Sequence, residues 1–330
     1  MGARDDVDNK NLKTMKQILN KYPDILTDYI NGMIDKTSYT KLVYSRYVGY
    51  FLDYILNRYK LNLYDDNSYK MIKPMYVNTY MENIRYNDDG SEKSVSYRNV
   101  QLAAIKGFFE FLEDNNIVEK NPCKNIKAPK DKKIHEIITI SKQDYQIMVN
   151  NIKNGVGNDK AKAIQKKWIN RDMALLILGL TTGIRLSAIV GIDIQDIDLE
   201  NGILNITEKG NQEKKIILGV QAVDAIKKWI RDRKKIASKE ENALFICKTG
   251  KRISTVAVEE RFRKIAQGTG KKITPHKMRA TCATTLYEKT GDIYLVQAQL
   301  GHKNIENTKR YAKVSDSKLK EAANVLNNIY

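Results

Sequence analysis

Cysteine is scarce in this sequence of 330 residues. The three cysteines, Cys123, Cys247 and Cys282, are an odd number, lie far apart and form no CxxC pair. This spacing excludes a disulfide framework and does not match the ligand pattern of a zinc site. We therefore expect reduced thiols in a cytosolic protein, and no zinc.

The sequence also lacks a long apolar run and an apolar leader. The longest apolar block, MALLILGL from Met173 to Leu180, is shorter than the roughly 20 residues that a membrane-spanning helix needs. The N-terminus, MGARDDVDNKNLK, is polar, and Asp6 stands where a myristoylation signal carries Ser or Thr. We expect no membrane segment and no targeting segment, and a cytoplasmic location.

Acidic residues are outnumbered by basic ones. The 57 Lys and Arg against 39 Asp and Glu give 57 − 39 = +18, and the pI is near 9.5. A strongly basic surface favours a polyanionic partner, and nucleic acid is the usual one. Charge alone does not separate an enzyme that acts on nucleic acid from a protein that only binds it.

A stretch rich in proline and lysine divides the sequence. The segment NPCKNIKAPKDKKIHE, from Asn121 to Glu136, has two prolines and a cationic run without periodicity, which is typical of an interdomain linker. The chain is long enough for two domains of roughly 100 to 200 residues. We therefore predict a first domain at residues 1–126, a basic linker at 127–134 and a second domain at 135–330.

The first domain has helical periodicity. Apolar residues recur at helical spacing within residues 10–34, 37–59 and 94–113, and Pro23 interrupts the first of these stretches. A further helix is expected near residues 75–86. The aromatic residues of these stretches are more typical of a core than of a surface that stacks on bases. We expect a helical domain.

The second domain has a helical pattern with one small sheet. Residues 173–183 are apolar on all sides, which predicts a buried helix. The segments ILNITE and KKIIL flank EKGNQE and predict an antiparallel hairpin, with Gly210 in the turn and Lys209 at its tip. The expected fold is mainly α with a small antiparallel sheet, and the second domain is of the α+β class.

The densest group of reactive side chains lies within residues 274–314. Two of the three histidines fall there, and His276 is followed three positions later by Arg279. Thr274-Pro275 predicts the start of a helix. Residues three apart share a helical face, so an imidazole and a guanidinium would project together from its first turn.

Glycines punctuate the rest of this stretch. Helices are expected to end at Gly291 and Gly301, which would fold the chain back and bring His302 and Tyr311 to the first histidine and arginine. Fixed arginines stabilise charge on phosphate oxygens, and a tyrosine can attack phosphorus to form a covalent phosphotyrosine. Together the four side chains suit phosphoryl transfer without a metal.

Three motifs resemble those of one known family. The segments PHKMRATCATTL and LGHKNIENTKRYAKV resemble the C-terminal signature of the tyrosine recombinases, the phage integrase family, in which an HxxR pair, an LGH element and a downstream tyrosine act together. TTGIRLSAIVGI resembles the family's first arginine motif. Two positions depart from the pattern: Ala188, where many members carry an acidic residue, and Ala280, where His or Lys is more usual.

The resemblance implies an active site. The catalytic residues that it implies are Arg185, Lys209, His276, Arg279, His302 and Tyr311. In this scheme the two arginines and His302 hold the scissile phosphate, and the tyrosine attacks it to form a 3′-phosphotyrosyl link. The hairpin lysine protonates the leaving 5′ oxygen, a role for which Lys214 and Lys215 are alternatives, and His276 assists proton movement. No metal and no cofactor is required.

The resemblance also implies the partners. These are double-stranded DNA with paired inverted-repeat core sites, a homotetramer on two such sites, and an accessory DNA-bending or directionality factor, in the bacterial cytosol or nucleoid. Residues 94–126 resemble the last helix of the family's core-binding domain, which clamps one face of the duplex. Candidate DNA contacts, which would position the protein without reading sequence, are Lys41, Arg46, Arg98, Lys106, Lys130 and Arg252.

Alternative functions would use the same residues for catalysis, none of them, or a different set of residues. A type IB topoisomerase or a telomere resolvase could use the same constellation, and a sequence-specific DNA-binding protein would bind DNA without catalysis. A metal-dependent transposase would need carboxylates from separate elements, whereas those of DIQDIDLE lie in one short stretch that is more typical of a structural edge. Mobile-element integration and excision, dimer resolution and inversion all remain open.

Overall fold

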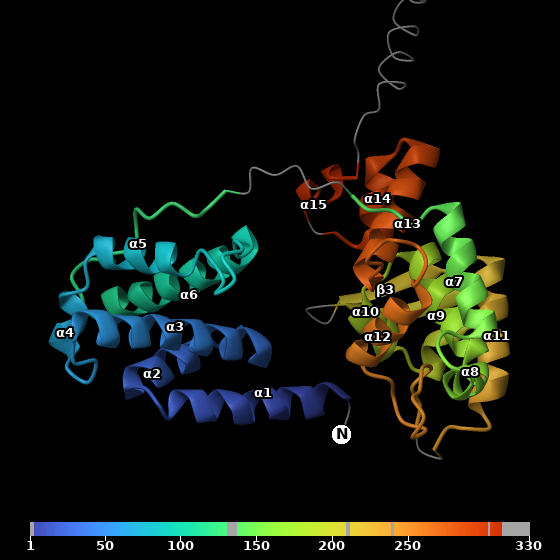
Figure 1. Ribbon diagram of the computed structural model, residues 1–330, viewed down its shortest axis with the longest axis horizontal. Helices are drawn as coiled ribbons and strands as arrows, with labels where there is room; N and C mark the ends of the chain where they lie inside the picture. Colours follow the sequence, from blue (N-terminus) through green and yellow to red (C-terminus); the bar gives the residue numbers. More distant parts are fainter. Residues whose placement is uncertain (1–2, 131–136, 209–211, 239–240, 303, 312–330) are drawn as a thin grey trace, which may run out of the picture. The chain divides into compact units, whose positions relative to one another are not determined.

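The structure is a computed structural model that describes residues 3–130, 137–208, 212–238, 241–302 and 304–311 (Figure 1). The chain forms two compact units, Met1–Ile134 and His135–Tyr330. The described residues are mainly helical and contain a three-stranded antiparallel sheet, as the sequence predicts. In the part of the chain that the structure describes, no helix is long and apolar enough to cross a membrane.

The first unit is a helical bundle around an aromatic core. Its helices are α1 (Ala3–Leu19), α2 (Asp24–Gly32), α3 (Ser38–Tyr59), α4 (Asp66–Lys70), α5 (Pro74–Asn83) and α6 (Val95–Asp114). The helix α3 lies between α6 on one side and α1 and α2 on the other (Figure 1). Phe51, Phe108 and Phe109 are fully buried where α3 and α6 meet. The side chains of Thr37 and Ser94 cap these two helices.

The second unit is built around the helix α9. Its helical elements are α7 (Lys142–Asn154), α8 (Asp159–Lys166), α9 (Ile169–Thr182), α10 (Leu186–Gly191), the 3-10 helix η1 (Ile194–Asp196), α11 (Val220–Arg233), α12 (Thr255–Ile265), α13 (Pro275–Thr290), α14 (Ile293–Leu300) and α15 (Glu306–Lys309). The helices α7, α11 and α13 all pack against α9. Leu175, Leu176 and Leu178 of α9 are buried, which confirms the prediction of a buried helix.

The sheet consists of β1 (Ile197–Asp198), β2 (Ile203–Glu208) and β3 (Gln212–Ile217), in that order. The strands β2 and β3 are antiparallel, which confirms the predicted hairpin, and Ile206 lies opposite Lys214. Its turn, with Lys209 and Gly210, lies outside the described residues.

The acidic stretch DIQDIDLE turns into this sheet. The Asp193 and Asp196 side chains form a capping box around η1, and the Asp198 carboxylate accepts backbone hydrogen bonds from Glu200 and Asn201. These contacts make it a structural edge. The described residues include no cluster of three or more His, Cys, Asp or Glu that could hold a metal ion.

Candidate active site

Arg185 lies where the chain leaves the buried helix α9. Gly183 ends that helix in the left-handed conformation, with φ 64°. A Cβ there would lie 2.9 Å from Leu300 Cδ2 and 3.1 Å from Cys282 Sγ, so only glycine allows α13 and α14 to approach this closely. Arg185 follows two residues later as the N-cap residue of α10 and is half-buried.

The helix α13 supplies the predicted histidine and arginine. It begins at Pro275, as predicted, although the Thr274 side chain makes no capping hydrogen bond. His276 is exposed, whereas Arg279 is only 5% exposed. The Arg279 guanidinium donates from Nη1 to the Gly183 carbonyl at 2.6 Å and from Nη2 to the Leu300 carbonyl at 2.7 Å. These two bonds fix the guanidinium between the ends of α9 and α14.

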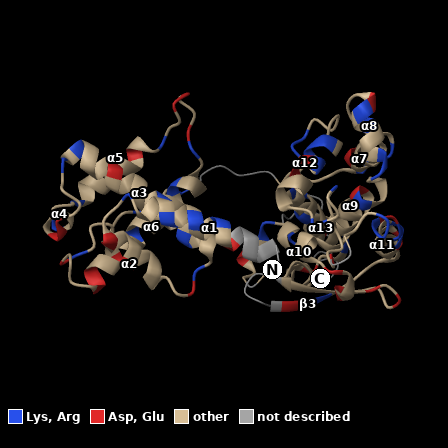
Figure 2. Cartoon of the chain, turned by 90° about the horizontal axis from the view of Figure 1, so that it is seen from below, with Lys and Arg blue, Asp and Glu red and all other residues tan. Residues whose placement is uncertain are grey.

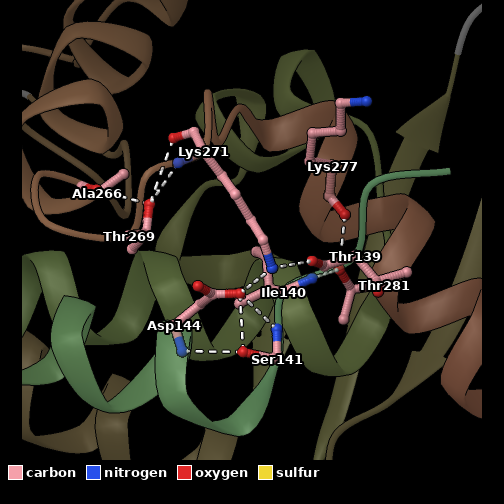
Figure 3. Close-up of polar contacts among 9 residues, drawn as sticks. All are labelled: Thr139, Ile140, Ser141, Asp144, Ala266, Thr269, Lys271, Lys277 and Thr281. Atoms are coloured by element: carbon pink, nitrogen blue, oxygen red, sulfur yellow. Dashed lines mark hydrogen bonds and ion pairs between the residues drawn. The ribbon is translucent and has the colours of Figure 1, made fainter. Parts of the chain in front are cut away.

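Polar contacts also tie α13 to the start of α7 (Figure 3). The Thr281 hydroxyl accepts a hydrogen bond from the Ile140 amide at 2.9 Å and donates to the Lys277 carbonyl at 2.8 Å. Nearby, Lys271 Nζ lies 2.6 Å from Asp144 Oδ2, and Asp144 forms a capping box with the helix-capping serine of α7. The first half of α13, which carries His276 and Arg279, is therefore tied to the start of α7.

His302 follows the last turn of α14. Gly301 ends this helix in the left-handed conformation, as predicted. His302 Nδ1 lies 2.8 Å from Thr308 Oγ1 in α15, and Thr308 is fully buried. The start of α15 is supported by Asn304, whose Oδ1 accepts a hydrogen bond from the Glu306 amide. A buried hydroxyl thus holds the imidazole ring from one side.

Tyr311 comes two residues after α15 and is 5% exposed. Its ring centroid lies 6.4 Å from that of His302, with the planes 18° apart. Its ring packs in a small apolar cluster whose other buried members are Ala280, Ala283, Val296 and Leu300. The Arg310 guanidinium lies 5.6 Å from the ring centroid. Ala280, one of the two departures from the family pattern, therefore packs beside this tyrosine.

The electrostatics of the site are strongly positive. Burial lowers the pKa of His302 to about 4, together with the nearby cations Arg279, Arg185, Lys214 and Arg310. The pKa of His276 is also lowered, by partial desolvation of its ring and then by Arg310, Arg279 and Lys277. Nearby positive charge disfavours the protonated imidazole. Both histidines are therefore neutral near pH 7, in a cluster of fixed cations that suits an anionic group.

The structure brings five of the six predicted residues to one place: Arg185, His276, Arg279, His302 and Tyr311. The sixth, Lys209, lies outside the described residues. The sequence motifs do not point to Thr308, whose only signal is its position three residues before the tyrosine. They indicate Lys214 only as an alternative to Lys209 and predict no role for Arg310.

Basic residues are spread over both units (Figure 2). Of the candidate DNA contacts, three have internal partners. Arg98 is buried and pairs with Glu92 at 3.0 Å, and Lys106 Nζ donates to the Ile126 carbonyl at 2.7 Å. Arg252 donates to the Val190 carbonyl at 2.8 Å and also pairs with a carboxylate. These contacts hold the three side chains within the protein, and their contact with DNA stays a prediction.

The other three candidate DNA contacts lie at the surface of the first unit. Lys41 and Arg46 are half-buried on α3, and Lys130 is exposed. For these three residues, contact with DNA stays a prediction.

Comparisons with known proteins agree with these motifs. The model of the Phage integrase family matches residues 139–318. Tyrosine recombinase XerC from Escherichia coli O157:H7 is 35% identical over 214 residues, which are 64% of this chain and 67% of that protein.

Solved structures share the fold. XerH site-specific recombinase in a post-cleavage complex with palindromic difH substrate has a TM-score of 0.69 at 20% identity, covering 97% of this chain and 89% of that one. The Tn1549 transposon integrase in complex with transposon right end DNA has a TM-score of 0.72 at 19% identity, covering 92% and 98%.

Proposed function

The chain belongs to the phage integrase family and is a tyrosine recombinase, an enzyme that cleaves and rejoins DNA; we propose that Tyr311 is its nucleophile. The observation that carries this proposal is the convergence of Tyr311, His302 and Arg279 from three separate helical segments. The cationic side chains next to these residues do not contribute to apolar packing. A phosphate of the DNA backbone would be attracted to them.

Arg185, Arg279 and His302 bind the scissile phosphate in this proposal. The bonds of Arg279 to two carbonyls hold its guanidinium between the ends of α9 and α14, and a guanidinium is the side chain best suited to bidentate binding of phosphate oxygens. If the Thr308 hydroxyl donates to His302 Nδ1, the neutral imidazole carries its proton on Nε2. That Nε2–H can then donate to a phosphate oxygen. Donors fixed in this way stabilise charge that develops on the phosphate in the transition state.

Tyr311 supplies the covalent step. Its Oη forms a bond to phosphorus while the bond from phosphorus to the 5′ oxygen breaks, which leaves a 3′-phosphotyrosyl link. The leaving 5′ oxygen takes a proton from Lys209, and the neutral His276 assists removal of the tyrosine proton. A 5′ hydroxyl of a partner strand then attacks the phosphotyrosine and releases the tyrosine. The cycle balances without a metal or a cofactor.

Residues 1–126 form the core-binding domain in this proposal, and residues 127–134 form the linker. Lys41, Arg46 and Lys130 are the surface cations that we propose to meet the DNA backbone. The partner is double-stranded DNA with paired inverted-repeat core sites, on which four protomers assemble with an accessory factor. We place the protein in the cytoplasm and favour mobile-element integration and excision or Xer-type resolution.

Covalent capture tests this function. Wild-type protein and Tyr311→Phe are incubated with fragmented DNA of the source organism in EDTA and denatured in SDS, and the protein-linked fragments are sequenced. We expect the wild type alone to retain DNA, enriched in one inverted-repeat sequence. Both proteins should bind that duplex equally before denaturation, because the substitution removes only one hydroxyl. A wild type that binds the duplex yet yields no adduct would refute catalysis by Tyr311.

A further inference from the structure

The C-terminal end of α14 is held by cationic side chains. Lys214 Nζ donates to the carbonyls of Ala298 at 2.7 Å and Gln299 at 2.6 Å. Arg279 donates to the next carbonyl, that of Leu300, at 2.7 Å. Three successive carbonyls at the end of one helix therefore accept from side chains that other elements supply.

A helix end is a favourable place for these cations. The last carbonyls of a helix have no partner within it and carry the negative end of the helix dipole. A cation that donates to them is stabilised there and also holds the end of the helix in place. His302 comes two residues after Leu300, and its own amide donates back to the Gln297 carbonyl at 3.2 Å. The position of the imidazole thus depends on this last turn.

The sheet explains why Lys214 reaches this point. Lys214 lies opposite Ile206 in the hairpin, and Ile206 and Ile216 are both buried. Because side chains alternate along a strand, Lys214 projects from the same face as these two isoleucines. Lys215 projects from the opposite face and is exposed. A lysine on the inner face must find acceptors, and the end of α14 provides them.

We propose that Lys214 is a positioning residue of the active site, which joins the hairpin to the end of α14 and so sets the position of His302. This inference rests on the proposed function of His302 as a phosphate ligand. It gives Lys214 a role different from that of a general acid, since the role follows from the bonds of its amine to two backbone carbonyls.

Three variants test the inference in the full-length protein. Lys214→Met removes the donor, Lys214→Arg keeps a charged donor for the same carbonyls, and Lys215→Met is the matched control on the outer face. The first readout is the rate of SDS-stable adduct formation with the captured DNA fragments at saturating protein. We expect Lys214→Met to lower this rate on the order of tenfold, because hydrogen bonds to a charged donor are lost. Lys214→Arg should restore most of it, and Lys215→Met should not change it.

The second readout needs no DNA. Histidines labelled with carbon-13 are titrated by NMR, and the His302 signal is assigned with His302→Gln. Lys214 is one of the four cations that lower the pKa of His302. The Lys214→Met protein keeps the other three, Arg279, Arg185 and Arg310, so the titration midpoint of His302 should rise from about 4. It should stay low in Lys214→Arg and in Lys215→Met.

The outcomes separate the two proposals. Equal adduct rates for Lys214→Met and the wild type, with an unchanged His302 midpoint, would overturn the role of Lys214. Failure of Lys214→Arg to recover either readout would overturn it as well, since a charged donor would then be insufficient. If the wild type itself forms no adduct, the proposed function fails instead, and the titration still decides whether the charge of Lys214 acts on His302.

Discussion

Replacing Thr308 by valine removes the hydroxyl that contacts the His302 imidazole and leaves the shape of the side chain almost unchanged. The hydroxyl lies 2.8 Å from His302 Nδ1, and Thr308 is fully buried, so water cannot readily take its place. Losing such a hydrogen bond and leaving a polar atom without a partner costs about 1–3 kcal/mol. Part of this cost falls on catalysis, because the free imidazole can rotate or carry its proton on Nδ1 instead of Nε2.

The expected result is a slower covalent step with unchanged DNA binding. A loss of about 1.4 kcal/mol of transition-state stabilisation lowers the rate roughly tenfold. The assay is single-turnover formation of the SDS-stable adduct at saturating protein, with duplex affinity measured separately. Thr308→Ser is the control, since it keeps the hydroxyl and should retain most of the rate. A folded Thr308→Val protein with the wild-type rate would refute the idea that Thr308 orients His302.

Two further predictions concern pH and packing. In the folded wild type, the NMR titration midpoint of His302 should lie near 4. In the unfolded chain a histidine titrates near 6.5, so between pH 4 and about 6.5 the unfolded state binds more protons than the folded state. Stability should therefore fall as the pH drops from about 6.5 to 4, and His302→Gln should flatten that part of the urea-unfolding profile. Gly183→Ala should lower the free energy of unfolding by about 1–3 kcal/mol, because φ is 64° and the added Cβ would meet Leu300. Gly191→Ala, where no atom lies within 4 Å of the added Cβ, should change urea unfolding little, and equal effects of the two substitutions would contradict the packing argument.

Local patterns in the sequence determined the helices and the types of residue in the site. Ser94 and Ser141 cap helices where a serine precedes an apolar periodic stretch, because the capping bond spans only three residues. Gly291 and Gly301 end helices in the left-handed conformation, because glycine lacks the Cβ that disfavours it. The histidines, the arginines and the tyrosine could be proposed from short motifs because each motif, like a helix cap, spans only a few residues of the chain.

The tertiary structure alone decided which partners these side chains have. Arg279 is held by carbonyls of Gly183 and Leu300, and Lys214 reaches the end of a helix more than eighty residues away in the sequence. Arg98 and Arg252 bear a positive charge that suggests DNA, yet each has an internal carboxylate partner. A hydrogen bond or ion pair of this kind depends on how separate elements pack, and neither spacing nor periodicity along the chain carries that information.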